Sequence, residues 1–524
     1  MLTNFFCFSA IFFICLIYAC FCGSSWLFSL ASLSLNGMYW NSMWQLDLIT
    51  IFVILMLCIC FGYAYFYTGH YFSYDLSGKQ LNIIICLFVA VMASLVFTGD
   101  FLTTLIFWEY LGVVSFFLIL FYMNYLSLRA SVVTLVSSRF GDVCLFLLIA
   151  ASLYLDGNNI FFTVLLFFII FTKSASFPFI SWLLEAMRAP TPVSSLVHSS
   201  TLVAAGVWFS MRYDIFLFMS DSFFYTLILL VTIFVTGVCC FFFLDLKKIV
   251  ALSTCNNIAW CIVYLIFGDV CLSLFQLLSH GVSKCLLFML VGDVMSGSGG
   301  SQASNCVYSP QLYGNWGVFG LFSVILGLSG APFVGVFFTK HFLLSTFSVS
   351  LNLFLFSFLS LCVFLSYFYS FRLCRVLYNL NTSLTCGVLF SFGSGLMVYF
   401  WLFVNFIIFS YLDEVSTVEI SVSTSLIIFQ FIACLTTYLF YNSTMLSSWS
   451  SSLFGCDNLV ELMFNLFNWW CAVVSIFFYR WDSKFLSIFN GRGVIFLNVY
   501  KNNLLNLTFV SMLLFIVIWV LYII

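Results

Sequence analysis

Apolar runs long enough to cross a lipid bilayer follow one another along almost the whole chain. Of the 524 residues, 64% are hydrophobic and only 6% are charged, and the mean hydropathy is +1.18. A soluble domain carries about 25% charged residues, because its surface must face water. This chain cannot supply such a surface and has to face lipid, so the sequence predicts an all-α polytopic membrane protein.

Each spanning helix needs about 20 consecutive apolar residues. Runs of this kind, bounded by polar residues or glycines, predict fifteen or sixteen spans, at 5–22, 46–67, 81–98, 101–123, 131–155, 158–173, 191–211, 222–244, 248–267, 270–295, 316–330, 335–348, 352–378, 386–410, 422–441 and 505–524. Residues 296–315 are expected to form a flexible polar connection. No removable signal peptide is expected, because the first residues lack a basic segment and run directly into apolar sequence.

Residues 455–503 differ from the rest, because charged side chains are interspersed with Phe and Trp. The charged residues are Asp457, Glu461, Arg480, Asp482, Lys484, Arg492 and Lys501. Their spacing disfavours a membrane span and predicts a long helix along the membrane surface or against neighbouring proteins. The apolar run 505–524 would anchor its end.

Composition argues against two classes of partner. Sixteen basic and eighteen acidic residues nearly cancel, which disfavours a nucleic-acid partner. The 21 cysteines include no Cys-x-x-Cys pair, and their spacing suits neither zinc nor an iron–sulfur cluster. We therefore expect no metal and no cofactor in this chain, and we interpret the cysteines as small apolar side chains.

Lys173 is the most informative single residue. It ends an apolar run, and an ionisable amine inside a bilayer costs roughly 2.5–3.5 kcal/mol at a helix centre. Pro178, Pro190 and Pro192 follow closely, and they are three of only five prolines in the chain. Prolines clustered in a membrane segment predict an interrupted helix, and interrupted helices line polar cavities.

Other ionisable residues also lie in apolar segments. Glu109 has no opposite charge close to it in sequence, whereas Arg139 and Asp142 are three residues apart and share a helix face. His198 follows the proline-rich break. Lys340 follows Pro332, which predicts a second interruption.

Gln276, His280 and Lys284 recur every four residues, so they stack on one face of a single helix. Each buried residue alone has a structural interpretation: a local ion pair for Arg139 and Asp142, or a satisfied core histidine. The set is harder to explain by packing, because chains of intramembrane Glu, His and Lys mark proton relays. Burial favours a neutral lysine and a nearby carboxylate favours a charged one, so a Glu–Lys pair of variable separation can switch the lysine.

Seven motifs occur in order along the chain: 108–116, Arg139-Phe-Gly-Asp142, 173–178, 189–206, 245–254, Ser279-His-Gly-Val-Ser-Lys284 and Phe337-Phe-Thr-Lys340. Together they resemble the antiporter-like membrane subunits of respiratory complex I and the related Mrp-type sodium/proton antiporters. The resemblance covers about 45–380, and the 189–206 string is its most specific part. Residues 44–47, 67–72 and the charged tail favour the complex I member that carries a lateral helix.

The resemblance implies two inverted five-helix repeats, each with one broken helix. The implied divisions are N-terminal helices at 1–100, repeats at 101–244 and 245–380, additional helices at 381–454, a lateral amphipathic helix at 455–503 and an anchoring helix at 504–524.

The resemblance also implies a role for each relay residue. Glu109 and Lys173 would form the switch, and His198 would lead toward the centre. His280 and Lys284 would form the central relay, and Lys340 would be the lysine on the exit side. Arg139, Asp142, Gln276 and His341 would support them. Two positions depart from the family: Gln276 stands where many relatives carry histidine, and His341 where they carry an acidic residue.

The resemblance further implies proton translocation coupled to electron transfer from NADH to ubiquinone in other subunits, which would hold FMN and the iron–sulfur clusters. Implied partners are the sibling antiporter-like subunits 4 and 2, reached through 455–503, and membrane lipids. The implied location is the mitochondrial inner membrane, with an organelle gene. Two alternatives remain: a stand-alone or Mrp-type cation/proton antiporter, and a purely structural membrane subunit.

Overall fold

The computed structural model describes most of the chain. The described residues are 25–35, 38–72, 75–152, 160–218, 222–267, 269–296, 298, 300–304, 306–310, 314–331, 335–350, 353–378, 381–383, 398–399, 401–406, 420–440, 453, 456–489 and 508–516. The expected span at 5–22 lies outside them, as do most of 386–410 and parts of 505–524.

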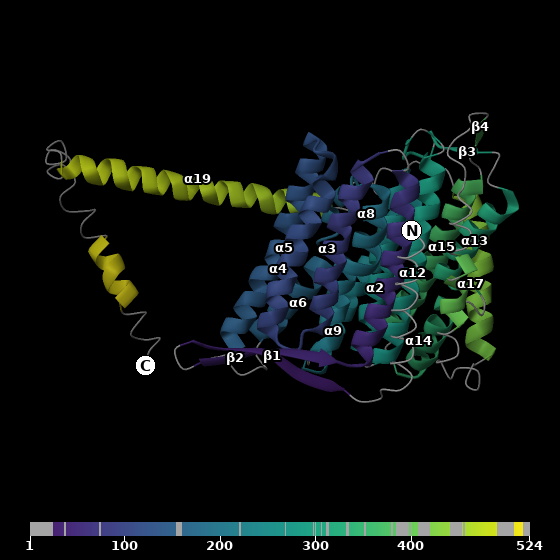
Figure 1. Cartoon of the computed structure of the whole chain (residues 1–524). Helices are drawn as coiled ribbons and strands as arrows, with labels where there is room; N and C mark the ends of the chain where they lie inside the picture. Colours follow the sequence, from purple (N-terminus) through teal and green to yellow (C-terminus); the bar gives the residue numbers. More distant parts are fainter. Residues whose placement is uncertain are drawn as a thin grey trace. The chain divides into compact units, whose positions relative to one another are not determined.

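The described residues are mainly helical (Figure 1). The helices are α2 (Leu48–Tyr71), α3 (Ser77–Phe97), α4 (Phe101–Ile119), η1 (Leu120–Tyr122), α5 (Tyr125–Ser152), α6 (Ile160–Lys173), α7 (Ser181–Ala186), α8 (Thr191–Leu196), η2 (Val197–Thr201), α9 (Leu202–Arg212), η3 (Ile215–Phe218), α10 (Ser222–Phe242), α11 (Leu246–Ile266), α12 (Val270–Ser296), α13 (Gly314–Ser329), α14 (Val336–Ser350), α15 (Leu353–Tyr378), α17 (Ile420–Leu439) and α19 (Cys456–Phe489). By length and composition, 11 helices in the described part can cross a membrane. The predicted all-α membrane fold is confirmed.

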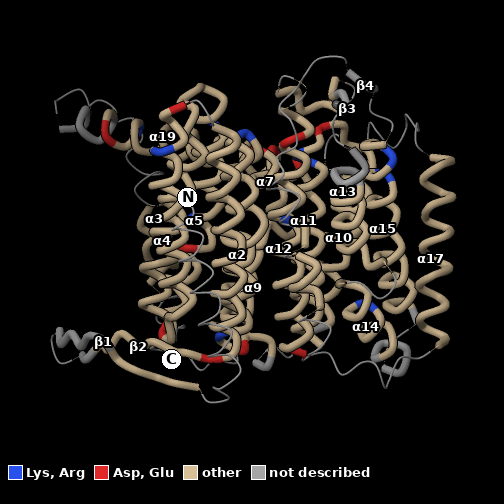
Figure 2. The backbone as a smooth tube through the Cα atoms, turned by 45° about the vertical axis from the view of Figure 1, so that its right-hand side comes forward, with Lys and Arg blue, Asp and Glu red and all other residues tan. Residues whose placement is uncertain are grey.

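Helix ends agree with the apolar runs to within a few residues, because the polar breaks fall at the helix ends. Figure 2 shows most charged residues near the two ends of the helices and few at mid-height. Among the helices, α12 is buried throughout its most apolar stretch, whereas only 33% of the corresponding stretch of α3 or α5 is buried. The bundle therefore has a central helix and peripheral helices that face lipid.

Two short sheets were not expected from the sequence. Strands β1 (Trp26–Leu35) and β2 (Met38–Leu46) form an antiparallel hairpin, and β3 (Tyr308–Pro310) pairs in parallel with β4 (Asn381–Ser383). The hairpin is fastened to the bundle by Asp100, whose carboxylate accepts hydrogen bonds from the Trp40 indole (2.9 Å) and the Met43 backbone N–H (3.2 Å). The same carboxylate caps α4 by accepting from the backbone N–H of Thr103.

The end of α9 is joined by an ion pair to the start of α2, next to the hairpin. Arg212 donates to the Asp47 carboxylate at 2.7 Å and to the Val96 carbonyl oxygen at 2.7 Å. Asp47 also forms the capping box of α2 with Thr50. A buried guanidinium needs such partners, because an unpaired charge is costly in an apolar interior. This contact fixes the orientation of α9.

Both expected helix interruptions are present. α6 ends at Lys173, and residues 174–180 form turns before α7 begins. α13 ends at Ser329, and α14 begins at Val336. Gly330 has φ +92° in the second break, a conformation that glycine adopts without a steric cost.

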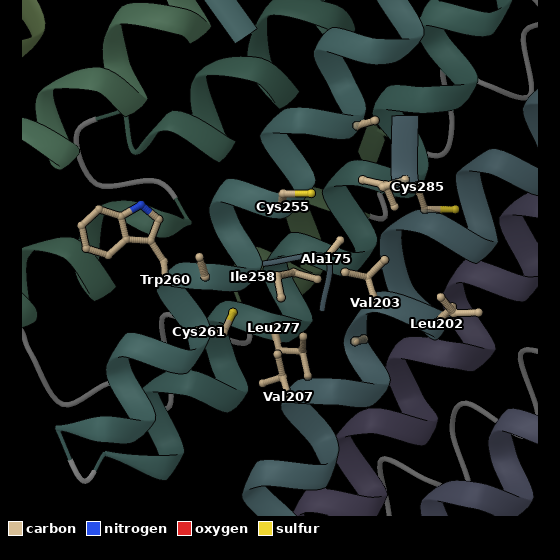
Figure 3. Packing of buried hydrophobic residues seen from close by; sticks show 14 of the residues in the cluster. Ala175, Leu202, Val203, Val207, Cys255, Ile258, Trp260, Cys261, Leu277 and Cys285 are labelled. Carbon is tan, nitrogen blue, oxygen red and sulfur yellow. The ribbon is translucent and has the colours of Figure 1, made fainter. Parts of the chain in front are cut away.

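Helices in this bundle approach one another through small side chains. A Cβ atom at Gly206 of α9 would lie 2.9 Å from the carbonyl oxygen of Ile170, so only glycine permits this approach of α9 to α6. Figure 3 shows small and branched side chains, among them Ala175, Val203 and Leu277, gathered where the break after α6 meets α9 and α12. The first break is therefore enclosed by protein.

Residues 457–524 form a second compact unit. Helix α19 occupies most of its described part, and the described side chains from Asp457 to Ser483 are exposed. The segment Cys456–Ser483 is long and apolar enough to span a membrane by length and composition. A helix is confirmed here, whereas its course along the membrane stays a prediction, as do the division boundaries.

Candidate functional site

Buried lysine and histidine side chains occur along the bundle from α6 to α14. They are Lys173, His198, Lys247, His280, Lys284, Lys340 and His341. Ionisable residues in membrane helices are costly and are retained at ion and proton pathways. Their immediate contacts indicate what each is able to do.

A chain of four charged side chains connects α4, α5 and α6. Arg139 forms an ion pair with Glu109 and lies 3.5 Å from Asp142, which in turn lies 3.5 Å from the Lys173 Nζ. No ion pair joins Glu109 directly to Lys173 among the described residues, because Arg139 lies between the two carboxylates and pairs with both. The switch expected of Glu109 and Lys173 stays a prediction. The expected Arg139–Asp142 pair is confirmed.

Burial differs along this chain of charges. The side chains of Glu109 and Arg139 are 39% and 34% exposed, whereas those of Asp142 and Lys173 are 1% and 0% exposed. Lys173 also lies over the Trp108 ring, 5.2 Å from its centroid. No hydrogen bond of normal geometry reaches its Nζ from the described residues. Asp142 is therefore the one carboxylate of the described residues that compensates the charge of a protonated Lys173.

A small cavity joins Lys173 to His198. The space open to the centre of a water molecule is about 10 Å³, close to what a single water needs, and its lining includes Ser115, Thr134 and Ser138 as well as Lys173 and His198. Hydroxyls and ionisable groups supply the several polar partners that a buried water needs. The structure thus brings two predicted relay residues to one polar cavity.

His198 lies in η2, a π-helical turn between α8 and α9. The turn leaves regular carbonyl bonding incomplete, and Thr201 compensates by donating to the Leu196 carbonyl oxygen at 3.0 Å. The imidazole packs near Trp182, with ring centroids 6.4 Å apart. π-Turns are frequent at functional sites, because they reorient one side chain within a helix.

Lys247 was missed by the sequence analysis, although it lies in the 245–254 motif. Its Nζ donates to the Ala189 carbonyl oxygen at 3.2 Å, just before α8. The adjacent Lys248 is 40% exposed and pairs with Asp245 at 3.1 Å. The sequence signal was available as two consecutive lysines at a helix start, because neighbouring side chains point about 100° apart and one is able to face inward while the other faces out.

The central helix α12 holds His280 and Lys284 as predicted. Lys284 donates to the Ser253 hydroxyl of α11. Neither ring nitrogen of His280 has a hydrogen-bond partner within the described residues. Gln276, one turn earlier, accepts from the Thr339 hydroxyl at 2.8 Å. This bond connects the central helix to the residue before Lys340.

Neutral groups surround Lys340. Its Nζ donates to the Ser329 carbonyl oxygen and to the Ser366 hydroxyl, both at 2.6 Å, and lies 4.6 Å from the Tyr367 ring centroid. Ser329 ends α13, so the break exposes its carbonyl oxygen to the lysine. No carboxylate of the described residues lies within ion-pair distance of this lysine. His341 is buried beside it, with its ring 6.0 Å from that of Phe337.

No group of three or more His, Cys, Asp or Glu side chains within the described residues is arranged to hold a metal ion. What the arrangement offers instead is a series of proton carriers separated by hydroxyl groups and a polar cavity. The assigned roles of the predicted residues remain predictions, since geometry does not measure flux.

The chain is similar in sequence to known proteins. It is 33% identical over 385 residues to the NADH-ubiquinone oxidoreductase chain 5 of Anopheles quadrimaculatus, covering 70% of this chain and 65% of that one. Identity to the chain 5 of Caenorhabditis elegans is 34% over 332 residues, covering 62% and 63%. The matched part thus spans slightly less than two thirds of these relatives.

A solved chain of the Mrp complex from Dietzia sp. DQ12-45-1b has the same fold, with a TM-score of 0.73 and 19% identity, covering 93% of this chain and 59% of that one. Residues 98–368 match the family described as NADH:quinone oxidoreductase/Mrp antiporter, TM. That match takes in more than half of the chain and all of the buried lysines and histidines described above, so the chain belongs to the transmembrane family of NADH:quinone oxidoreductases and Mrp antiporters.

Proposed function

We propose that this chain is a proton-conducting membrane subunit of an NADH:ubiquinone oxidoreductase, equivalent to chain 5 of its relatives. The observation that carries the proposal is the set of buried ionisable side chains in the helices from Asp142 to Lys340, to which Arg139 and Glu109 are joined by ion pairs. The similarity to chain 5 of insects and a nematode supports the assignment to this enzyme. Electron transfer from NADH to ubiquinone would occur in other subunits, which would hold the FMN and iron–sulfur clusters.

Arg139 is the moving part of the proposed switch. When Arg139 pairs with Glu109, the Asp142 carboxylate is left to stabilise a protonated Lys173. When Arg139 turns to Asp142, that carboxylate is neutralised and Lys173 loses its counter-ion. A buried ammonium without a counter-ion is unfavourable, so Lys173 then gives up its proton.

The released proton passes through the cavity to His198. Water in the cavity carries it from Nζ to the imidazole, which accepts at one nitrogen and donates from the other. Lys247, His280 and Lys284 continue the route along α11 and α12. Lys340 receives the proton last, where two oxygen acceptors stabilise its charged form.

Partners and location follow from the same assignment. The sibling antiporter-like subunits 4 and 2 would contact the 455–503 segment, whose described side chains present a long apolar surface with few charges. The complex would lie in the mitochondrial inner membrane with the gene in the organelle. An Mrp-type cation/proton antiporter is the alternative, favoured by the fold shared with the Mrp complex.

Native electrophoresis of gently solubilised membranes tests the assignment. The gel is stained for NADH oxidation, and this chain is located by mass spectrometry. We expect it in a very large band that oxidises NADH. Its presence only in a small band that does not oxidise NADH would overturn the oxidoreductase assignment in favour of the antiporter.

A further inference from the structure

A second ion pair lies outside the relay described above. His70, near the end of α2, has its Nε2 3.6 Å from the Oδ1 of Asp293, near the end of α12. The side chain of His70 is 22% exposed, whereas that of Asp293 is 1% exposed. The imidazole therefore connects solvent at this end of the helices to a buried carboxylate.

Tyr67 extends this pair inward. It lies three residues before His70, so both side chains occupy one face of α2. A Cβ atom at Gly292 would lie 2.5 Å from the Tyr67 hydroxyl oxygen and 3.4 Å from the Thr191 Cβ. The tyrosine hydroxyl thus lies against α12, beside both Asp293 and Thr191.

Thr191 connects this cluster to the relay. It begins α8, and two residues before it the carbonyl of Ala189 accepts from the Lys247 Nζ at 3.2 Å. α8 leads directly into the turn that holds His198. His70, Asp293, Tyr67 and Thr191 therefore lie near one another from the end of α2 inward, and the segment that begins α8 brings Lys247 close to the inner end of this group.

Resting on the proposed function, we propose that His70 and Asp293 form a proton port that supplies Lys247 from the aqueous phase at the end of α2. A proton binds the imidazole from water at Nδ1, and the proton on Nε2 transfers to the Asp293 carboxylate. Asp293 then passes it through the Tyr67 and Thr191 hydroxyls to a neutral Lys247. Each transfer moves one proton and breaks no other bond, so no further reactant is needed.

The test compares variants in the assembled complex in sealed vesicles, as protons translocated per NADH oxidised. His70→Gln should lower this ratio, and Lys247→Met should lower it at least as far, because Lys247 also carries the proton that arrives from His198. The double variant should be no lower than Lys247→Met alone, because the port acts only through Lys247. Groups acting in one pathway are non-additive in this way. Tyr67→Phe, which preserves the ring packing, should lower the ratio in the same direction.

Lys248→Gln is the matched control, because it breaks an exposed ion pair at the same end of the helices, and it should retain the normal ratio. A normal ratio in His70→Gln, or additive losses in the double variant, would overturn the port. If His70→Gln reduces the amount of assembled complex, the near-isosteric Asp293→Asn decides between the same outcomes. If Lys173→Met lowers the ratio of protons to NADH but His70→Gln, Tyr67→Phe and Asp293→Asn do not, the port is overturned and the proposed function stands. If Lys173→Met and Lys247→Met also pump normally, the proposed function is overturned.

Discussion

The two broken helices present a lysine in opposite ways. Lys173, at the end of α6, faces Asp142 at 3.5 Å within a network of charges. Lys340, in α14, is held by a backbone carbonyl, a hydroxyl and an aromatic ring. Charged partners are able to move and so change the protonation state of a lysine. Fixed dipoles, such as a backbone carbonyl, favour the protonated state throughout. The comparison supports the proposal that the first break switches a lysine and the second accepts the proton.

Removing the switched lysine should have the largest effect. Lys173→Met is similar in size and cannot carry a proton, and positioned proton-transfer groups contribute roughly 10²–10⁴-fold to a rate. We expect the complex to assemble and oxidise NADH while the conduction through this chain is lost, measured as protons per NADH in vesicles. Lys248→Met serves as the control, and an unchanged ratio in Lys173→Met would remove the distinction between the two lysines.

Removing the carboxylate beside Lys173 should affect both stability and conduction. Asp142→Asn leaves Lys173 and Arg139 without their shared partner, and breaking a buried ion pair costs about 3–5 kcal/mol. We expect less assembled complex and a lower midpoint of thermal unfolding for it. The double variant Asp142→Asn/Lys173→Met should recover part of that loss, and failure to recover would contradict the coupling between the two side chains.

Weakening the fixed site should have a smaller effect. Ser366→Ala removes one of the two oxygen acceptors of Lys340, and a hydrogen bond to a charged group contributes about 1.5–3 kcal/mol. We expect conduction to slow by roughly ten- to a hundredfold while assembly is retained. Ser357→Ala, at an exposed position of the same helix, should have no effect. Equal rates in both variants would show that Lys340 does not need this acceptor.

The outer end of the network should matter least. Glu109 is 39% exposed, and exposed ion pairs contribute only about 0–1 kcal/mol. Glu109→Gln should therefore slow conduction by up to about fivefold, in the same vesicle assay. A complete loss would mean that Glu109, and not Asp142, is the carboxylate that controls Lys173.

The helices were predictable because lipid imposes a length and a composition on each span, and the polar breaks marked their ends. The interruptions near Lys173 and Lys340 were predictable from the prolines that follow Lys173 and precede Lys340, because proline cannot continue a regular helix. The hairpin at β1 and β2 was not, because its strands depend on contacts with the bundle, such as those made by Asp100. The contact of Arg139 with Glu109 was missed because the pairing of Arg139 with Asp142, three residues away on the same helix, already accounted for the charge of Arg139.

The pair of His70 and Asp293 could not be predicted either, since nothing local to either residue points to the other. Residues with a local signal, such as Gln276, His280 and Lys284 at helical spacing, were placed correctly on one face of α12. Ion pairs between distant helices depend on which faces meet, and a single sequence does not specify this.

The π-helical turn at η2 also sets the rotation of α9 about its own axis. A residue in a regular helix advances the chain by about 100°, so one residue more or fewer in this turn would rotate α9 by that angle. Arg212 at the far end of α9 would then point away from Asp47. The turn that orients the imidazole of His198 therefore also determines which way Arg212 points at the opposite end of α9. The number of residues in the turn is constrained both by the position of His198 and by the contact of Arg212 with Asp47.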